Sequence, residues 1–302
     1  MRISTSFMYQ QLSERMSRSS SELAELQGQI ASGLKYNKPS DAPDIVGRAL
    51  AIESRINGFK SDENSISQAR QGVDAQATAL ESGQNLFVRL TELSIQGASG
   101  QYTQSERSAM ADEVHSIKLA LVTLANSRDA DGRYVFGGTS SAAAPYSVNG
   151  EGTVTYSGGS TPLRVKVSES GFEDTTIAGP TAWQGVTRNN SKVDLFVVVN
   201  DLETSLKSGA VANVRNAIDE IGVITDHISG AMARIGASQN RLTAAENQAK
   251  ELTERARLVL SEIKDLDYAS ALSDLKKQEV LVQASQALMG RLSQISLLDY
   301  LR

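Results

Sequence analysis

Apolar residues recur at every seventh position along most of this chain, a spacing that is typical of helices packed side by side. The C-terminal stripe has two heptad columns and a flanking pair: Leu281, Leu288 and Ile295; Gln278, Ser285 and Leu292; Val282 and Met289. A helix cannot bury such a stripe alone, so this segment needs a partner helix. The run continues through residues 297–301, and we expect neighbouring copies to complete the burial of this apolar end.

A matching heptad repeat occupies residues 1–34. Its columns are Tyr9, Met16, Leu23 and Ile30, and Leu12, Ser19, Leu26 and Gly33. This segment is the natural partner for the C-terminal stripe. Each end could instead pack on the body of its own subunit, because a heptad shows that a partner is needed without identifying it.

The middle of the chain carries two longer repeats. The first comprises Ile52, Phe59, Ile66, Val73, Leu80 and Phe87, and the second Val214, Ile221, Ile228, Ile235, Leu242, Ala249, Ala256 and Ile263. A continuous helix from Val211 to Leu266 would be about 80 Å long at 1.5 Å per residue. Between the repeats, Thr103 and Glu106 form a predicted capping box that opens another helix.

The composition changes near Gly132. Ten of the 23 glycines lie between Gly132 and Gly185, and short alternating runs predict strands at residues 134–136, 153–156 and 163–167. Residues 193–206 are apolar enough to predict a buried helix. The long helices are therefore expected to run out to the β-rich segment and back, antiparallel, so that both chain ends meet.

These patterns predict a mainly α fold: an elongated rod of long antiparallel, coiled-coil-like helices with a small β-rich insertion domain at its tip. Residues 1–43 and 264–302 are expected to form terminal coiled-coil segments. Residues 44–133 and 181–263 are expected to form a central helical rod domain, and residues 134–180 the β-rich insertion.

Composition and charge narrow the function. The hydrophobic content is 40% with only 5% aromatic residues, which suits an aliphatic helical bundle. The net charge of −5 argues against nucleic acid as a partner. No apolar run approaches the length that membrane insertion needs, no cleavable signal peptide is visible, and there is no cysteine for disulfides or thiol catalysis.

Candidate chemistry is sparse. His115 and His227 each flank a heptad residue and stand in no metal-ligand spacing, and Glu262, Asp265 and Asp267 do not match a calcium loop. Trp183 is expected to anchor the junction between the insertion and the helices. An enzyme within the insertion is a rival hypothesis, but residues 134–180 hold neither His nor Cys. We therefore predict a protein that is not an enzyme, with no cofactor and no metal.

Several blocks of the sequence resemble the flagellin superfamily of bacterial flagellar axial proteins, and most closely its hook–filament junction members. The blocks are MRIST (1–5), SGL (32–34), PSDAP (39–43), GRYVFGGT (132–139), RIGASQNRL (234–242), DLDYA (265–269) and SLLDYL (296–301). Ala42 replaces an acidic residue and Leu298 an aromatic residue of the family pattern, and the match beyond Thr139 is loose.

The resemblance implies a secreted structural subunit of the extracellular flagellum, exported through the flagellar type III apparatus. Such a subunit joins the hook, through hook-associated protein 1, to the flagellin filament; its other implied partners are copies of itself and an export chaperone. In that family both ends are flexible in the monomer and form the inner layer of the assembly. A minor flagellin is the alternative, against which the Asp-Tyr-Leu ending and the small insertion speak.

The predicted assembly interface combines the two terminal stripes. It comprises Tyr9, Leu12, Met16, Leu23, Leu26, Ile30, Leu281, Leu288, Leu292, Ile295, Leu298 and Tyr300.

Overall fold

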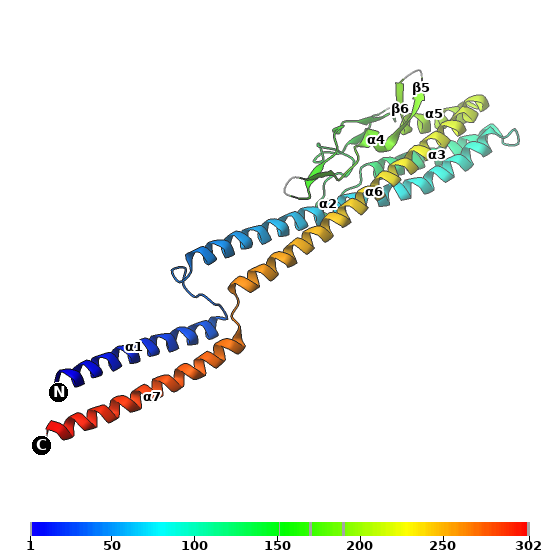
Figure 1. The fold of residues 1–302 in the computed structure, drawn as a ribbon. Coiled ribbons are helices and arrows are strands. Elements are labelled where there is room, and N and C mark those ends of the chain that lie inside the picture. The colour runs from blue at the N-terminus through cyan, green and yellow to red at the C-terminus, as the bar shows by residue number, and fades with distance from the viewer. Residues whose placement is uncertain (1, 151, 169–170, 189–190, 301–302) are drawn as a thin grey trace. The chain divides into compact units, whose positions relative to one another are not determined.

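The computed structural model describes residues 2–150, 152–168, 171–188 and 191–300, without the side chains of residues 2–6, 191 and 292–300. Its elements, in chain order, are α1 (Arg2–Ser32), α2 (Pro43–Ala98), α3 (Gln104–Ala125), β1 (Tyr146–Val148), β2 (Val154–Tyr156), β3 (Arg164–Lys166), β4 (Phe172–Asp174), α4 (Gly179–Trp183), β5 (Gln184–Arg188), β6 (Ser191–Asp194), α5 (Leu195–Ser208), α6 (Val211–Lys264) and α7 (Tyr268–Tyr300) (Figure 1). The mainly α fold class predicted from the heptads is confirmed.

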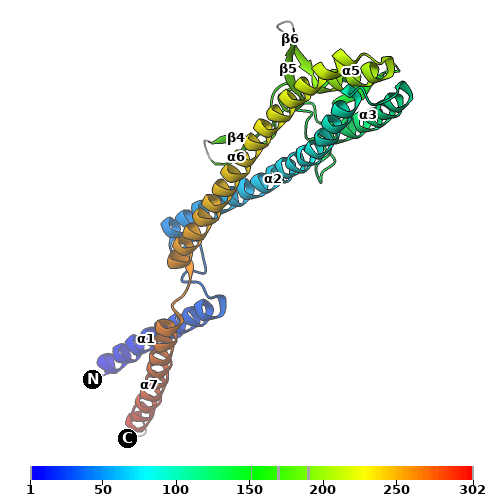
Figure 2. The ribbon, with the colours of Figure 1, turned by 90° about the vertical axis from the view of Figure 1, so that its right-hand side faces the viewer.

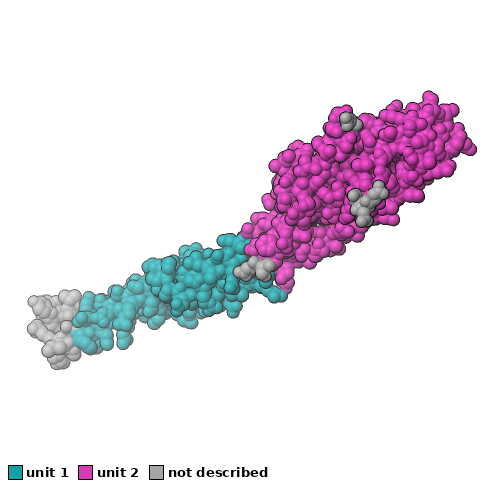
Figure 3. Space-filling view, turned by 90° about the horizontal axis from the view of Figure 1, so that it is seen from above, with its two compact units in different colours: residues 1–58, 252–302 teal, residues 59–251 magenta. Residues whose placement is uncertain are grey.

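The chain divides into two compact units (Figure 3). Unit 1 comprises residues 1–58 and 252–302, and unit 2 comprises residues 59–251. Both long helices, α2 and α6, begin in one unit and end in the other.

In unit 2, α2 and α6 run antiparallel. Arg70 pairs with Glu246 at 2.8 Å, and Gln84 donates to Ser229 at 3.2 Å, so the partner numbers fall as the chain advances. The predicted heptad columns meet in the core: Ile66, Val73, Leu80 and Phe87 on α2, and Val214, Ile221, Ile228, Ile235 and Leu242 on α6 are all buried. The period of seven thus identified the buried faces of both helices.

Helices α3 and α5 of unit 2 pack on each other, and both begin at side-chain caps. At the start of α3 the predicted capping box between Thr103 and Glu106 is present. Asp194 caps α5 by accepting from Phe196 N, and Gly209 ends that helix in the left-handed conformation at φ 70°. The predicted helix at residues 193–206 is therefore confirmed as α5, which starts two residues later.

The described strands form three antiparallel pairs, β1–β2, β3–β4 and β5–β6. Strands β2 and β3 lie within the predicted runs, but the predicted strand at residues 134–136 is wrong. Only an isolated bridge joins Tyr134 to Arg128 there, because the chain turns at once through Gly137 and Gly138. The β5–β6 hairpin, within the range assigned to the helical rod, was not predicted.

Candidate assembly interface

In unit 1 the two terminal helices, α1 and α7, pack on each other as an antiparallel pair (Figures 1 and 2). The residues that face the partner are partly or fully buried and alternate steps of four and three: Leu12, Met16, Ser19, Leu23, Leu26 and Ile30 on α1, and Ala271, Leu275, Gln278, Val282, Ser285 and Met289 on α7. The N-terminal stripe is thus the partner of the C-terminal one within the same chain.

The line of α7 residues that faces α1, here called the seam, does not follow the heptad column of Leu281 and Leu288. Leu281 and Leu288 lie outside the seam, with exposed fractions of 53% and 52%. The seam runs instead through Gln278, which donates to Ser19 O at 3.2 Å and to Glu22 Oε2 at 2.7 Å. These two hydrogen bonds satisfy a polar side chain that would be costly to bury unpaired, and they favour the rotation of α7 that turns Gln278 toward α1.

Apolar side chains therefore remain exposed on both terminal helices. On α7 they are Tyr268, Leu272, Val280, Leu281 and Leu288, and on α1 they are Phe7, Met8 and Tyr9. Of the predicted interface residues, Leu12, Met16, Leu23, Leu26 and Ile30 face α7, whereas Tyr9, Leu281 and Leu288 face away. The side chains of Leu292, Ile295, Leu298 and Tyr300 lie outside the described residues.

The two chain breaks that bound this pair are bonded to each other. Leu34 and Asp265 form an isolated antiparallel bridge, in which Lys35 N donates to Lys264 O and Leu266 N to Gly33 O, both at 2.9 Å. Gly33 has φ 74°, and a Cβ there would lie 2.8 Å from Tyr268 Oη. The positive φ therefore favours glycine here, and any other side chain would also have to displace the Tyr268 hydroxyl.

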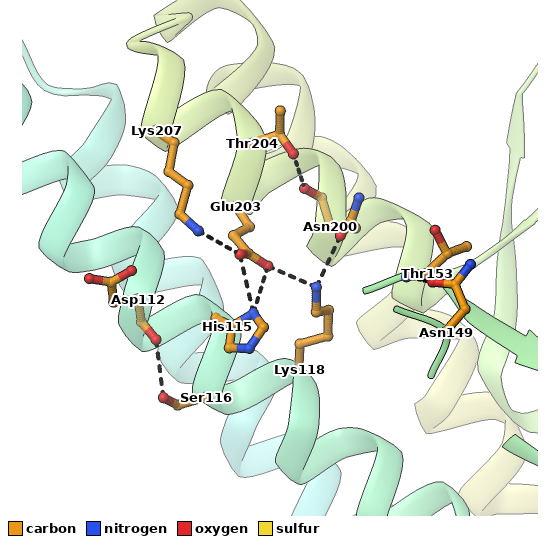
Figure 4. A network of polar contacts seen from close by, with 10 residues as sticks. All are labelled: Asp112, His115, Ser116, Lys118, Asn149, Thr153, Asn200, Glu203, Thr204 and Lys207. Atoms are coloured by element: carbon orange, nitrogen blue, oxygen red, sulfur yellow. Dashed lines mark hydrogen bonds and ion pairs between the residues drawn. The ribbon is translucent and has the colours of Figure 1, made fainter. Parts of the chain in front are cut away.

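A buried polar network joins α3 to α5 in unit 2 (Figure 4). Lys118, with 1% exposure, donates to Glu203 at 2.8 Å and to Asn200 at 3.0 Å. Lys207 also donates to Glu203, at 2.9 Å, and His115 Nδ1 lies 3.2 Å from the same carboxylate. Burial alone would raise the pKa of Glu203, but the bonds from Lys118, Lys207 and His115 outweigh it and lower the pKa to about 2.

A second buried polar residue, Gln76 of α2, holds the β-rich region. Its Nε2 donates to Val135 O at 2.6 Å and Ile177 O at 2.8 Å, and its Oε1 accepts from Ile177 N at 3.1 Å. Nearby, Trp183 is 1% exposed and meets Phe136 edge to face at 5.4 Å. The expectation that Trp183 anchors this junction is confirmed, whereas Gln76 and the Lys118–Glu203 pair were not predicted.

His227 and Asp267, two of the candidate chemical groups, have structural partners. His227 Nε2 bonds to Thr181 O at 2.9 Å, and Asp267 caps the start of α7 through Ala269 N at 3.0 Å. Within the described residues, no three His, Cys, Asp or Glu side chains gather as a metal site requires. In the same part of the chain, no helix is both long and apolar enough to cross a membrane.

Comparison of the sequence with known protein families identifies the family of this chain. Models of the bacterial flagellin N-terminal and C-terminal helical regions match residues 3–141 and 218–301, more than half of the chain together. The chain belongs to the flagellin superfamily.

Relatives within the superfamily match over nearly the whole chain. Flagellar hook-associated protein 3 of Salmonella typhimurium is 24% identical, over 94% of this chain and 95% of the relative. Flagellin of Bacillus subtilis is 25% identical over 93% and 92%. The crystal structure of the flagellar junction protein from Legionella pneumophila has a TM-score of 0.59 at 15% identity, covering 72% of this chain and 99% of that one, and so shares its fold.

Proposed function

We propose that this flagellin-superfamily protein is a structural subunit of the bacterial flagellum that joins the hook, through hook-associated protein 1, to the flagellin filament. The observation that carries the proposal is the near full-length similarity to flagellar hook-associated protein 3. The subunit acts outside the cell after export through the flagellar type III apparatus, with an export chaperone as an earlier partner. A chain without cysteine suits a route that requires an unfolded polypeptide.

The terminal pair supplies the assembly surface in this proposal. One face of α7 is buried against α1, and the face that carries Leu281 and Leu288 is exposed. Each leucine is already about half covered, so its burial against neighbouring subunits would contribute about 1 kcal/mol, half of the value for a fully exposed side chain. Copies of the chain, hook-associated protein 1 and flagellin would each cover part of this surface, and the terminal helices become fully ordered only on incorporation.

Deleting residues 275–302 tests the proposal. The truncated chain should keep a folded unit 2, because the core of that unit lies within residues 59–251. It should fail to polymerise and to support filament growth. Normal filaments on cells that produce only the truncated chain would contradict the proposal.

A minor flagellin is the second candidate, because the Bacillus subtilis flagellin is as similar as the hook-associated protein. Electron microscopy of a null strain separates the two. Hooks without filaments, with flagellin shed into the medium, support the junction role, and a shortened or altered filament supports the flagellin. Immunogold labelling should place the protein in one band between hook and filament.

A further inference from the structure

The chain contains two Asn-Gly pairs, Asn57-Gly58 and Asn149-Gly150, and the structure places them in opposite surroundings. An asparagine that precedes glycine can lose its side-chain amide spontaneously, because glycine has no Cβ to hinder its backbone nitrogen from attacking the asparagine Cγ. Asn57 lies inside α2, whereas Asn149 and Gly150 lie in the exposed turn between β1 and β2. The backbone around each pair therefore decides which of them reacts.

The helix protects the first pair. Gly58 N belongs to the hydrogen-bond ladder of α2, several turns from either end of that helix. Side chains of an α-helix tilt toward its N-terminus, so the amide of Asn57 is directed away from Gly58 N. The preceding residue, Ile56, is buried, and unwinding the helix here would expose it.

The turn leaves the second pair open to attack. Gly152 N donates to Asn149 O at 3.0 Å and closes the turn. Gly150 N, the attacking nitrogen, donates to none of the described residues, and Gly150 is exposed, so water can take its proton. The turn joins two strands of only three residues each, so its local opening costs little free energy.

One hydrogen bond favours the reaction at Asn149. Thr153 N donates to Asn149 Oδ1 at 2.8 Å, and the two residues lie side by side in Figure 4. Attack on Cγ places negative charge on Oδ1, and a backbone N–H already directed at that oxygen stabilises the charge. The turn therefore supplies both an unbonded nucleophile and a donor for the developing oxyanion.

From this arrangement we propose that Asn149 is a site of spontaneous deamidation in the folded chain and that Asn57 is not. Gly150 N gives its proton to water and forms a bond to Asn149 Cγ. The bond between Cγ and Nδ2 then breaks, and Nδ2 takes a proton from water and leaves as ammonia, which gives a five-membered succinimide. Water adds to either carbonyl carbon of the ring and opens it to aspartate or isoaspartate. The reaction needs only water, so it does not depend on the proposed flagellar role.

The products differ from the original chain in charge and in backbone. Either product adds one negative charge to the net charge of −5. In isoaspartate the main chain also runs through Cγ and gains one atom, so the bonds from Asn149 N to Thr153 O and from Gly152 N to Asn149 O cannot keep their geometry. The modification therefore yields a more acidic chain with an altered β1–β2 turn.

Hydroxylamine tests the site, because it cleaves a succinimide and so breaks the chain between asparagine and glycine. The folded full-length chain, incubated with hydroxylamine, should give fragments of residues 1–149 and 150–302. In urea both pairs should be cleaved, because unfolding removes the helix that protects Asn57. A folded chain that is cleaved at Asn57 as fast as at Asn149, or at neither pair while the urea sample is cleaved, would overturn the proposal.

Mass spectrometry of the chain after prolonged incubation at neutral pH gives an independent test. The peptide that contains Asn149 should gain about 1 Da, as NH2 is replaced by OH, at least tenfold faster than the peptide that contains Asn57. Gly150→Ala should slow this gain about tenfold or more, because its methyl group hinders the attacking nitrogen. A Cβ at position 150 would meet no atom within 4 Å, so the variant should fold normally.

Gly58→Ala is the matched control, since a Cβ there also meets no atom within 4 Å, and it should leave the rate at Asn149 unchanged. Gly150→Ala that deamidates at the wild-type rate would contradict attack by Gly150 N and overturn the proposal.

Discussion

The side chain of Lys118 shows how much a single buried charge depends on one partner. Its ammonium group is held by Glu203 and Asn200 in the α3–α5 contact. Glu203→Gln would leave that ammonium without a counter-charge, and removing one partner of a buried pair costs about 3–5 kcal/mol. We expect urea unfolding to show a loss of this size.

Two further variants check this interpretation. Adding Lys118→Met to Glu203→Gln should recover most of the loss, because no uncompensated charge then stays buried. Lys276→Met removes an ion pair whose lysine is 70% exposed, and it should leave the unfolding midpoint unchanged. A double variant as unstable as the single one would show that shape, and not charge, dominates this contact.

Asp194 gives a second prediction at the residue scale, on pH. Burial raises its pKa to about 6, although the bonds from Phe196 N and Gln184 act to lower it. A raised pKa means that this group contributes stability below its unfolded pKa of about 3.8, which is lost as the pH rises through 6. Asp194→Asn keeps a good helix cap without the buried charge. Its unfolding free energy should exceed that of the wild type by up to about 3 kcal/mol at pH 8.

The pH profile supplies the control for Asp194→Asn. The advantage of the variant should shrink as the pH falls from 6 to 4, because the wild-type carboxyl then becomes neutral as well. The low pKa of Glu203 acts in the opposite direction, but it is common to both proteins and cancels in the difference. A difference that is independent of pH would contradict the assignment.

At the scale of elements, α7 has one apolar face that packs on α1 and a second apolar face that is exposed. Replacing Leu281 and Leu288 by Ser should leave the helicity and protease resistance of the α1–α7 pair unchanged, because both are exposed. Under the proposed function the same change should abolish polymerisation and motility. Circular dichroism, limited proteolysis and a swarming assay measure the two effects separately.

The matched change on the other face is Val282→Ser with Met289→Ser, since both residues face α1. It should loosen the pair and increase the proteolysis of α1 and α7. If the Leu281 and Leu288 variant loosened the pair equally, the division of α7 into two faces would be wrong.

The heptad periodicity of the sequence predicted most of the long helices. It located the helices and their buried faces because a heptad is a local signal that repeats eight times in α6. It could not choose among three adjacent columns of α7, because the choice depends on contacts such as those of Gln278 with residues more than two hundred positions away. The buried roles of Gln76 and Glu203 were not predicted for the same reason. An isolated polar residue belongs to no repeat, and the sequence around it does not identify partners that are distant along the chain.

At the scale of the whole molecule, the two compact units predict separable folding. The buried heptad residues of α2 and α6 from Ile66 to Leu242 all lie within residues 59–251. A fragment of residues 59–251 should therefore unfold cooperatively in calorimetry, at a temperature close to that of the main transition of the full chain. A fragment without a cooperative transition would show that unit 2 needs the terminal helices to fold.

The bridge between Leu34 and Asp265 has a consequence for the order in which the parts of the chain fold. The backbone that ends α1 bonds to the backbone that precedes α7, so each turn supplies hydrogen-bond partners to the other. Residues 33–35 bond to residues 264–266, more than two hundred positions further along the chain, and contacts between such distant residues form late in folding. We therefore expect the contacts between α1 and α7 to form last, after unit 2 has folded.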